Sequence, residues 1–394
     1  MKFKDFVTLQ RGFDLPRTQM EEGPHPVVGS TSIIGYHAEF KVSPPGVVTG
    51  RSGSLGKVQY LTVPYWPHNT ALWVKDFKGN YPRFVYYCIQ TLDFAQFNAG
   101  AGVPTLNRNH LDSLDVSVPA LATQRKIAGV LSAYDDLIEN NTRRIAILEE
   151  MAQAIYREWF VNFRFPGHEK VKLINSPLGK IPEGWKWAKL KDVCDSVNYG
   201  YTASANKEVE VGPRFLRITD IVPTSIDWEN VPYCEVDEDD AAKYALGEGN
   251  IVIARTGATT GYAKRLHKRH PKSVFASYLV RIVPSEAMGK HYIGLIVESD
   301  DYKAFIKRNL GGAAQPQANA QVLTSLDVLV PSPDAIATFD RQIEPMADQK
   351  EILQEKNRNL RKTRDLLLPK LIGGQLDVEE LDIDAGEPLE AEAE

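Results

Sequence analysis

The sequence predicts an α/β (α+β) fold with a two-fold internal duplication, in which two globular units are separated by a long antiparallel two-helix coiled coil. Two observations lead to this prediction. An apolar rhythm typical of coiled-coil helices occurs once in each half of the chain, and short motifs recur in the same order in both halves. The chain has 394 residues, which is too long for one ordinary domain.

The first long helix is expected from about Gln124 to Phe160. Its apolar or near-apolar side chains follow alternating steps of four and three residues, provided that Asn141 is counted among them. These positions are Ile127, Leu131, Tyr134, Ile138, Asn141, Ile145, Leu148, Ala152, Ile155 and Trp159. At about 1.5 Å per residue the apolar edge is on the order of 50 Å long. A helix of this length with one apolar edge needs a partner helix.

A second helix with the same rhythm begins near Ile343 and supplies this partner. Its edge consists of Ile343, Met346, Lys350, Leu353, Asn357, Leu360, Arg364, Leu367 and Leu371. Antiparallel alignment with Asn141 facing Asn357 brings the steps of the two edges into phase, and a buried asparagine pair fixes register at a cost in stability. Because Pro345 and Pro369 lack an N–H, regular helix is expected mainly between them. The alternative is two unrelated amphipathic helices with accidental asparagines.

The duplication is visible in repeated motifs. Val48–Gly53 (VTGRSG) resembles Val252–Gly257 (VIARTG), and the tetrapeptide Ser-Leu-Asp-Val at residues 113–116 recurs at residues 325–328. The offset between matching residues grows along the chain, as expected of one ancestral unit with loop insertions in its second copy. The sequence therefore predicts two units of the same architecture.

Short β-type runs between Gly, Pro and Asn turn signals precede each long helix. We expect strands at Gly46–Thr49, Lys57–Val63, Ala71–Val74, Gly249–Ala254, Tyr262–Leu266 and Ser277–Val283. We expect shorter helices at Tyr81–Thr91 and Lys290–Asn309. The proline- and glycine-containing linker Phe165–Trp185 marks the boundary between the first long helix and the second unit.

The net charge of −5 conceals local basic patches. Residues 377–394 hold nine acids and no base, and this tail is expected to be disordered, so the rest of the chain carries +4. Between Gly249 and Ser285 there are seven bases and no acid, and between Phe40 and Lys75 there are four bases and no acid. Local basic patches are typical of nucleic-acid binding, with a solvated basic face as the alternative for each.

Several classes of protein and site are not indicated. No apolar run approaches the roughly 20 residues of a membrane span, the N-terminus has no signal-peptide core, and a cytoplasmic protein is expected. Cys88, Cys194 and Cys234 lie far apart, and the eight histidines are scattered without metal-ligand spacing. Residues 51–58 resemble a P-loop only superficially, because Arg51 replaces its first glycine and Val58 its Ser or Thr. The sequence predicts binding surfaces rather than catalytic chemistry.

Two loops, residues 50–57 and 255–261, combine an arginine with hydroxyls and glycines. Such loops suit phosphate oxygens, and the arginine can reach a guanine edge; a tight hairpin with a solvated arginine is the alternative. The candidate DNA-contacting residues of the first half are Tyr36, Arg51, Ser52, Ser54, Lys57, Asn69, Asn107 and Arg108. Those of the second half are Arg255, Thr256, Thr259, Lys264, Arg265, Tyr278, Gln317 and Asn319.

Over about residues 1–376 the plan resembles the DNA-specificity subunit of type I restriction–modification enzymes. The resemblance lies in the motifs PALATQRKI (residues 119–127), IYREWF (155–160), SPLGKIPEGW (176–185) and LLLPKLIGGQL (366–376). Thr123 stands where the family more often has Glu, and the region before Ile343 is longer and less typical. The resemblance implies a first target-recognition domain at 1–122, a spacer helix at 123–165, a second target-recognition domain at 166–335, a spacer helix at 336–376 and an acidic tail at 377–394.

The resemblance implies a non-catalytic subunit rather than an enzyme. Each domain would read one half of a bipartite, asymmetric double-stranded DNA target, and the helices would set the gap between the halves. Two modification (methyltransferase) subunits and restriction (endonuclease/translocase) subunits would be partners, with S-adenosylmethionine, ATP and Mg²⁺ bound by them and no cofactor or metal in this chain. Two alternatives remain: a helical scaffold without sequence-specific DNA binding, and a free-standing DNA methyltransferase or nuclease, against which the absence of cofactor and metal motifs argues.

Overall fold

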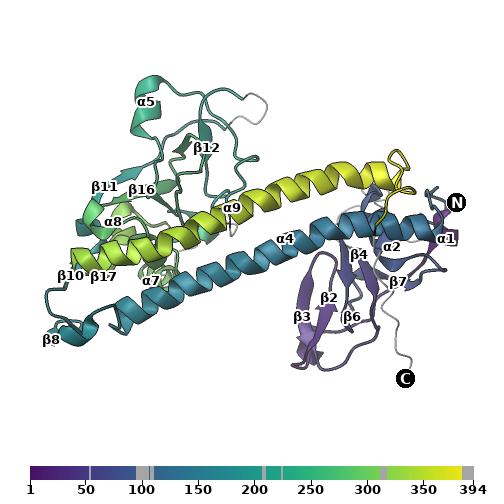
Figure 1. Cartoon of the computed structure of the whole chain (residues 1–394), viewed down its shortest axis with the longest axis horizontal. Coiled ribbons are helices and arrows are strands. Elements are labelled where there is room, and N and C mark those ends of the chain that lie inside the picture. Colours follow the sequence, from purple (N-terminus) through teal and green to yellow (C-terminus); the bar gives the residue numbers. More distant parts are fainter. Residues whose placement is uncertain are drawn as a thin grey trace. The chain divides into compact units, whose positions relative to one another are not determined.

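The computed structural model of the chain divides into two compact units (Figure 1). The first unit consists of Met1–Asn140 and Asn357–Glu394, and the second consists of Asn141–Lys356. The structure describes residues 1–52, 55–94, 106, 111–205, 210–222, 225–310 and 317–383. Among these residues, no helix combines the length and apolar character that crossing a membrane requires.

The first unit is built around a four-stranded antiparallel sheet. Its strands, in spatial order, are β1 (Thr8–Arg11), β7 (Ala71–Asp76), β4 (Gly46–Gly50) and β5 (Val58–Leu61). All five residues of β4 are buried, because this strand has a neighbour on both edges and side chains packed on both faces. A smaller sheet has the order β3 (Ile33–His37), β2 (His25–Val28) and β6 (Trp66–Pro67). The short helices are α1 (Phe3–Phe6), η1 (Arg17–Gln19) and α2 (Pro82–Gln90).

The second unit has a central antiparallel sheet of the same design. Its strands, in spatial order, are β11 (Cys194–Tyr199), β16 (Leu279–Pro284), β13 (Ile251–Ala254) and β14 (Ala263–Arg265). Three strand pairs lie beside it: β12 (Arg214–Leu216) with β15 (Ser273–Phe275), β8 (Leu173–Ser176) with β9 (Gly179–Pro182), and β10 (Lys186–Lys189) with β17 (Asp327–Val330). The short helices are η4 (His168–Lys170), η5 (Leu190–Val193), α5 (Glu238–Lys243), η6 (Gly257–Thr259), η7 (Glu286–Met288), α6 (Tyr292–Val297), α7 (Asp300–Asn309) and α8 (Ala320–Leu323).

The predicted duplication is confirmed by these two sheets. In both, the strand that comes first along the chain pairs with the one that comes fourth, followed by the second and the third. Detail repeats as well: Lys2 forms an ion pair with Asp115 at 2.9 Å, and Lys189 forms one with Asp327 at 2.8 Å. Asp115 and Asp327 belong to the repeated Ser-Leu-Asp-Val motif, so the sequence repeat marks the same place in both units.

The six predicted strands and the predicted helix at Tyr81–Thr91 are all present, with ends shifted by a few residues. The predicted helix Lys290–Asn309 is wrong as a single element, because the structure has two helices, α6 and α7, in its place. The side chain of Ser299 accepts a hydrogen bond from the backbone N–H of Tyr302 and so caps the start of α7. A cap of this kind begins a new helix in the middle of a helical pattern.

The two long helices are α4 (Leu121–Tyr156), which continues into the π-helical turn η3 (Arg157–Val161), and α9 (Pro333–Ile372). In the first unit Arg364 forms an ion pair with Asp135 at 2.6 Å, and Asn357 Nδ2 donates to the carbonyl of Ile138 at 3.3 Å. In the second unit Lys350 forms an ion pair with Glu149 at 2.7 Å. In these contacts a higher residue number on α9 goes with a lower residue number on α4: Asn357 meets Ile138, and Arg364 meets Asp135. The two helices therefore run in opposite directions, and the predicted antiparallel packing is confirmed (Figure 1). The two cations in the apolar edge of α9 are each matched by a carboxylate of α4.

The prediction that regular helix lies mainly between the two prolines is wrong. Helix α9 begins at Pro333 and runs through both Pro345 and Pro369. Ile343 and Ala347, on either side of Pro345, are buried, and this packing outweighs the roughly 3 kcal/mol that an interior proline costs. Asn141 and Asn357 are both buried polar residues of the helix pair. That these two asparagines face each other stays a prediction.

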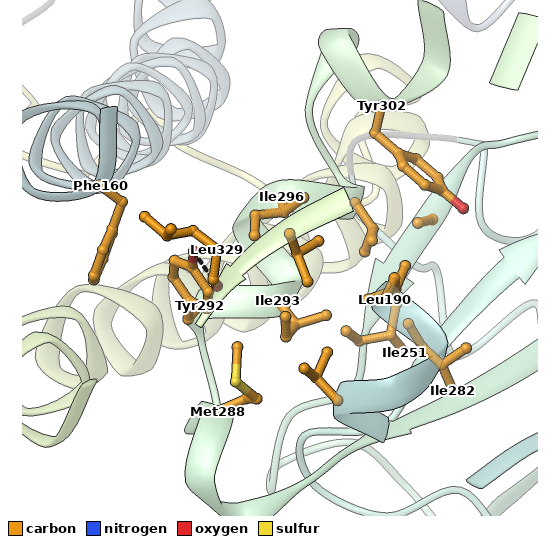
Figure 2. Close-up of a cluster of buried hydrophobic side chains, with 14 of the residues drawn as sticks. Phe160, Leu190, Ile251, Ile282, Met288, Tyr292, Ile293, Ile296, Tyr302 and Leu329 are labelled. Carbon is orange, nitrogen blue, oxygen red and sulfur yellow. Dashed lines mark hydrogen bonds between the residues drawn. The ribbon is translucent and has the colours of Figure 1, made fainter. Parts of the chain in front are cut away.

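The core of the second unit gathers around the end of the first long helix. The ring of Phe160 contacts the rings of Tyr156, Trp159, Trp185, Tyr292 and Phe339. Figure 2 shows Phe160 beside Tyr292, whose hydroxyl donates to the carbonyl of Leu329 at 2.9 Å. The IYREWF motif therefore supplies the aromatic centre of this core, which also includes sheet residues such as Ile251 and Ile282.

Gly12 and Gly200 each follow the first strand of their sheet, β1 and β11, and they give a first testable prediction. A Cβ on Gly12 would lie 2.2 Å from the carbonyl oxygen of His68, and a Cβ on Gly200 would lie 2.2 Å from that of Ala276. We expect Gly12→Ala and Gly200→Ala each to destabilise the protein by about 1–3 kcal/mol, because the backbone must move apart. The measurement is the midpoint of denaturant unfolding. Gly247→Ala is the control, since its Cβ would meet nothing closer than 3.8 Å; equal effects of the three substitutions would contradict the packing argument.

Candidate nucleic-acid interface

Arg51 stands immediately after the central strand β4, at one end of the first sheet. Its backbone N–H donates to the carbonyl of Thr70 at 3.0 Å, and its own carbonyl accepts from the N–H of Leu106 at 2.8 Å. The guanidinium Nη1 reaches the carbonyl of Asn69 at 3.5 Å. We call these four residues, Arg51, Asn69, Thr70 and Leu106, the Arg51 cradle.

Arg255 stands immediately after β13 and repeats this arrangement in the second unit. Its backbone N–H donates to the carbonyl of Tyr278 at 3.1 Å, and its carbonyl accepts from the N–H of Ala318 at 2.8 Å. The guanidinium Nη1 reaches the carbonyl of Ser277 at 3.4 Å. We call Arg255, Ser277, Tyr278 and Ala318 the Arg255 cradle.

The two cradles hold their arginines by neutral groups. Among the described residues, no carboxylate lies within ion-pair distance of either guanidinium, so the contacts position the charge without cancelling it. A guanidinium held in this way keeps donors for an external acceptor, such as a phosphate oxygen or the O6 and N7 atoms of guanine. The predicted roles of Arg51 and Arg255 are therefore compatible with their surroundings.

The Arg51 cradle is surrounded by small polar side chains. Ser30 Oγ donates to the carbonyls of both Ser52 and Thr70 at 2.7 Å, which ties the β2–β3 turn to the loop. Asn69 donates to Asp14, and Asp14 also forms an ion pair with Arg11 at 3.0 Å. The structure thus brings three predicted residues, Arg51, Ser52 and Asn69, into one place.

The Arg255 cradle is more aromatic. The guanidinium carbon of Arg255 lies 4.8 Å from the centre of the Tyr199 ring. Tyr278 is 57% exposed, and Thr256 forms a β-bridge with Gln317. These contacts bring four predicted residues together: Arg255, Thr256, Tyr278 and Gln317.

Other predicted residues lie near a cradle but serve the local backbone. Asn319 caps α8 by accepting from the N–H of Val322 at 2.8 Å. Thr259 ends η6, and its carbonyl accepts from the N–H of Tyr262 at 2.9 Å. The exposed Lys57 lies next to the Arg51 loop, because its carbonyl accepts from the N–H of Gly50 at 3.3 Å.

Three predicted residues lie elsewhere in their unit. Tyr36 is 55% exposed and lies on β3 of the smaller sheet, where it pairs with Pro26. Lys264 and Arg265, on β14, border a cavity of about 1160 Å³ that α4, α6, α7 and α9 also line within the second unit. Burial lowers the pKa of Lys264. The remaining predictions, Ser54, Asn107 and Arg108, lie outside the described residues.

The basic run of the second half does not form one basic patch. Lys268 forms ion pairs with Glu344 at 3.1 Å and Asp348 at 2.8 Å, and Arg269 forms one with Glu355 at 3.5 Å. His270 meets Glu351 at 3.1 Å. We call Glu344, Asp348, Glu351 and Glu355 the acidic face of α9. These carboxylates lie about 80 residues further along the chain, so they do not appear in a charge count over residues 249–285. The basic surface of the second unit is therefore smaller than the sequence predicted.

Histidines at the acidic face of α9 give a pH prediction. His291 is 3% exposed, and burial, aided by the positive charge of Arg265, lowers its pKa to about 4, although Glu344 opposes this. The unfolded chain has a histidine pKa near 6.5, so it binds more protons than the folded state below that pH. Stability contributed by neutral His291 is thus present above about pH 6.5 and is lost as pH falls towards 4, by about 2 kcal/mol at pH 5.

The measurement is the unfolding free energy from pH 7 to pH 5 for the native protein and His291→Gln. Burial also lowers the pKa of His267, and contacts with Lys268 hold the pKa values of Glu344 and Asp348 low, so the native protein should lose stability over a wider range. We expect His291→Gln to lose less between pH 7 and pH 5. An identical slope in both proteins would contradict the role of His291.

Sequence reasoning missed Tyr199, Ser30 and Thr70. Tyr199 has a signal in the sequence, since it precedes Gly200, the repeat of Gly12, and so stands where the first unit has Arg11. Ser30 and Thr70 take part through hydrogen bonds to or from backbone carbonyls, and such contacts have no recognisable sequence motif. No three His, Cys, Asp or Glu of the described residues are close enough to hold a metal ion.

Comparison with known proteins finds similarity to one family. Residues 1–150 match the family model described as type I restriction modification DNA specificity domain. The chain is 27% identical over 314 residues to the type I restriction enzyme MjaIX specificity subunit of Methanocaldococcus jannaschii, covering 77% of this chain and 71% of that protein. It is 24% identical over 289 residues to the MjaVIII specificity subunit of the same organism, covering 72% and 67%.

The fold is similar to a solved structure as well. The crystal structure of the type I restriction–modification S subunit from M. genitalium matches with a TM-score of 0.61, covering 94% of this chain and 95% of that one. At 14% sequence identity this match shows a common fold. The predicted pair of α/β units with packed long helices is the fold that the two proteins share.

Proposed function

Since the chain is a specificity subunit of a type I restriction–modification system, and thus its non-catalytic member, we propose that it reads a bipartite, asymmetric DNA target. The first unit reads one half of the target through the Arg51 cradle, and the second unit reads the other half through the Arg255 cradle. The observation that carries this proposal is the repetition of one arginine geometry, on equivalent strand ends, in two units with different surroundings.

The repeated architecture of the two units and the different side chains around their arginines have separate consequences for DNA reading. A duplicated frame presents two similar reading surfaces from one chain, as a two-fold dimer presents two half-site readers. Different side chains around the arginines select different bases, because polar, charged and aromatic groups match different edges of a base pair. The small polar surroundings of Arg51 and the aromatic surroundings of Arg255 therefore support unequal half-sites.

The long helices have two roles in this proposal. α4 has 36 residues and α9 has 40, and both continue from one unit into the other. They set the number of base pairs between the two half-sites. They also dock two modification subunits, which methylate adenine with S-adenosylmethionine, and restriction subunits, which use ATP and Mg²⁺.

The experiment that tests the proposal is selection of bound sequences from a randomised duplex library by the reconstituted complex of this chain with its modification subunits. We expect two short motifs of different sequence, separated by a gap of fixed length. A single contiguous motif would contradict bipartite reading. Binding without any sequence preference would favour the scaffold alternative.

The role of the helices gives a further prediction. Deleting seven residues, or about 10 Å of helix, from matching places of α4 and α9 should shorten the gap by roughly three base pairs. The gap is read from the library selection described above. A gap of unchanged length with retained binding would contradict the spacing role of the helices, and unchanged half-site motifs serve as the internal control for folding.

A further inference from the structure

The ring of Tyr199 is fixed at both ends, and it lies against the guanidinium of Arg255. Its backbone belongs to β11 and pairs with Val280 of β16. At the far end its hydroxyl oxygen accepts a hydrogen bond from the backbone N–H of Ala320 at 3.0 Å. The guanidinium carbon of Arg255 lies 4.8 Å from the centre of this ring.

The guanidinium of Arg255 is therefore held from two directions. The Tyr199 ring lies against the guanidinium, and the carbonyl of Ser277, at 3.4 Å from Nη1, contacts one of its nitrogens. An arginine held in this way loses less freedom when it binds, because its planar group is already restrained. Bidentate recognition of guanine needs this orientation, since two parallel N–H donors must meet O6 and N7.

The first unit has no ring at the equivalent position. Arg11 stands there, immediately before Gly12, and it forms an ion pair with Asp14 at 3.0 Å. Arg51 thus has a carbonyl contact like that of Arg255, but its neighbour at this position is a cation held by a carboxylate. The two units therefore differ in the side chain at this position, a tyrosine ring in the second and an ion-paired arginine in the first.

We propose that Tyr199 is a specificity-determining positioning residue that orients Arg255 to read a guanine in the half-site of the second unit. This inference rests on the proposed function, because it requires Arg255 to face DNA. It goes further by assigning the base and the residue that sets the stringency of its recognition. Tyr199 acts through Arg255 and makes no contact with DNA in this scheme.

The test compares three variants in the reconstituted complex with modification subunits. Tyr199→Phe keeps the ring and removes the hydroxyl, Tyr199→Leu removes the ring, and Tyr233→Leu is the matched control. Tyr233 lies 4.0 Å from the guanidinium of Arg214, a ring–arginine pair of the same kind within the second unit but outside the cradle. Each complex is titrated with duplexes in which every position of both half-sites is varied, at two salt concentrations.

We expect Tyr199→Leu to lower discrimination for guanine at one position of one half-site by about fivefold, the size of a well-placed cation–π contact. Tyr199→Phe should retain at least half of the discrimination, and Tyr233→Leu should retain all of it. The other positions of the same half-site should be read normally by all three, which shows that the second unit is folded in each protein. Unchanged discrimination in Tyr199→Leu would overturn the proposal.

Two further outcomes would also overturn it. Equal loss in Tyr199→Leu and Tyr199→Phe would assign the effect to the Ala320 hydrogen bond instead of the ring. Uniform weakening over all sequences, with a shallower dependence on salt, would assign Arg255 to a phosphate. Arg255→Ala separates these failures from failure of the proposed function: if it changes one half-site while Tyr199→Leu does not, only the role of Tyr199 is wrong.

Discussion

Arg255→Ala is expected to relax base preference in one half of the target and to leave the other half unchanged. Arg255 is held at the end of β13 by neutral carbonyls and an aromatic ring, so its charge is available to DNA. A good bidentate arginine contact contributes about 1–3 kcal/mol of discrimination against the wrong base. Because alanine removes this contact and nothing in the first unit changes, the loss should be confined to one position or its neighbours.

The measurement is the equilibrium affinity of the reconstituted complex for duplexes with single-base changes in each half-site. Arg51→Ala is the mirror experiment and should relax the opposite half. Lys307→Ala serves as a surface-charge control, because Lys307 is exposed on α7 of the second unit and takes no part in the cradle contacts. If Arg255→Ala weakened recognition of both halves equally, the assignment of one half to each unit would be wrong.

Phe160→Ala is expected to have the largest effect on stability, a loss of about 3–5 kcal/mol. Phe160 is 5% exposed and touches five aromatic rings from the helices and the linker of the second unit, so alanine leaves a cavity that its rigid neighbours cannot fill (Figure 2). The loss should concentrate in the second unit, whose core is organised around this ring.

Hydrogen exchange followed by peptide mass spectrometry measures this loss unit by unit. We expect peptides from β13 and β16 to exchange faster in Phe160→Ala, while peptides from β4 and β7 keep their protection. Val161→Ala is the matched control, since Val161 is the next residue and is 56% exposed. Faster exchange of similar size in both units would contradict a core specific to the second unit.

The parts of the fold that follow from regular patterns could be predicted from the sequence. The apolar rhythm of residues 127–159 predicted α4, and the repeated Ser-Leu-Asp-Val motif predicted a duplication that both sheets confirm. The prediction failed where tertiary packing outweighs local preference. Pro345 lies inside a continuous helix because its neighbours Ile343 and Ala347 are buried.

Part of the candidate interface could also be predicted, because it lies in repeated sequence motifs. Arg51 and Arg255 follow short buried strands in repeated motifs, so their position at the sheet ends could be read from the sequence. The ion pairs of Lys268 could not be predicted from the sequence, because its partners Glu344 and Asp348 are about 80 residues away along the chain. Charge counts within a window do not show which carboxylates folding brings to a basic loop.

The most direct test is a genome-wide map of methylated adenines in three strains that express, together with the modification subunit, the native chain, Arg51→Ala or Arg255→Ala. If each unit reads one half of the target, the complex that contains either variant will methylate sites that are degenerate in one half only. The degenerate half will differ between the two variants, and the gap will be the same in all three strains. The same altered half in both variants, or equal degeneracy of both halves in either one, would contradict the account.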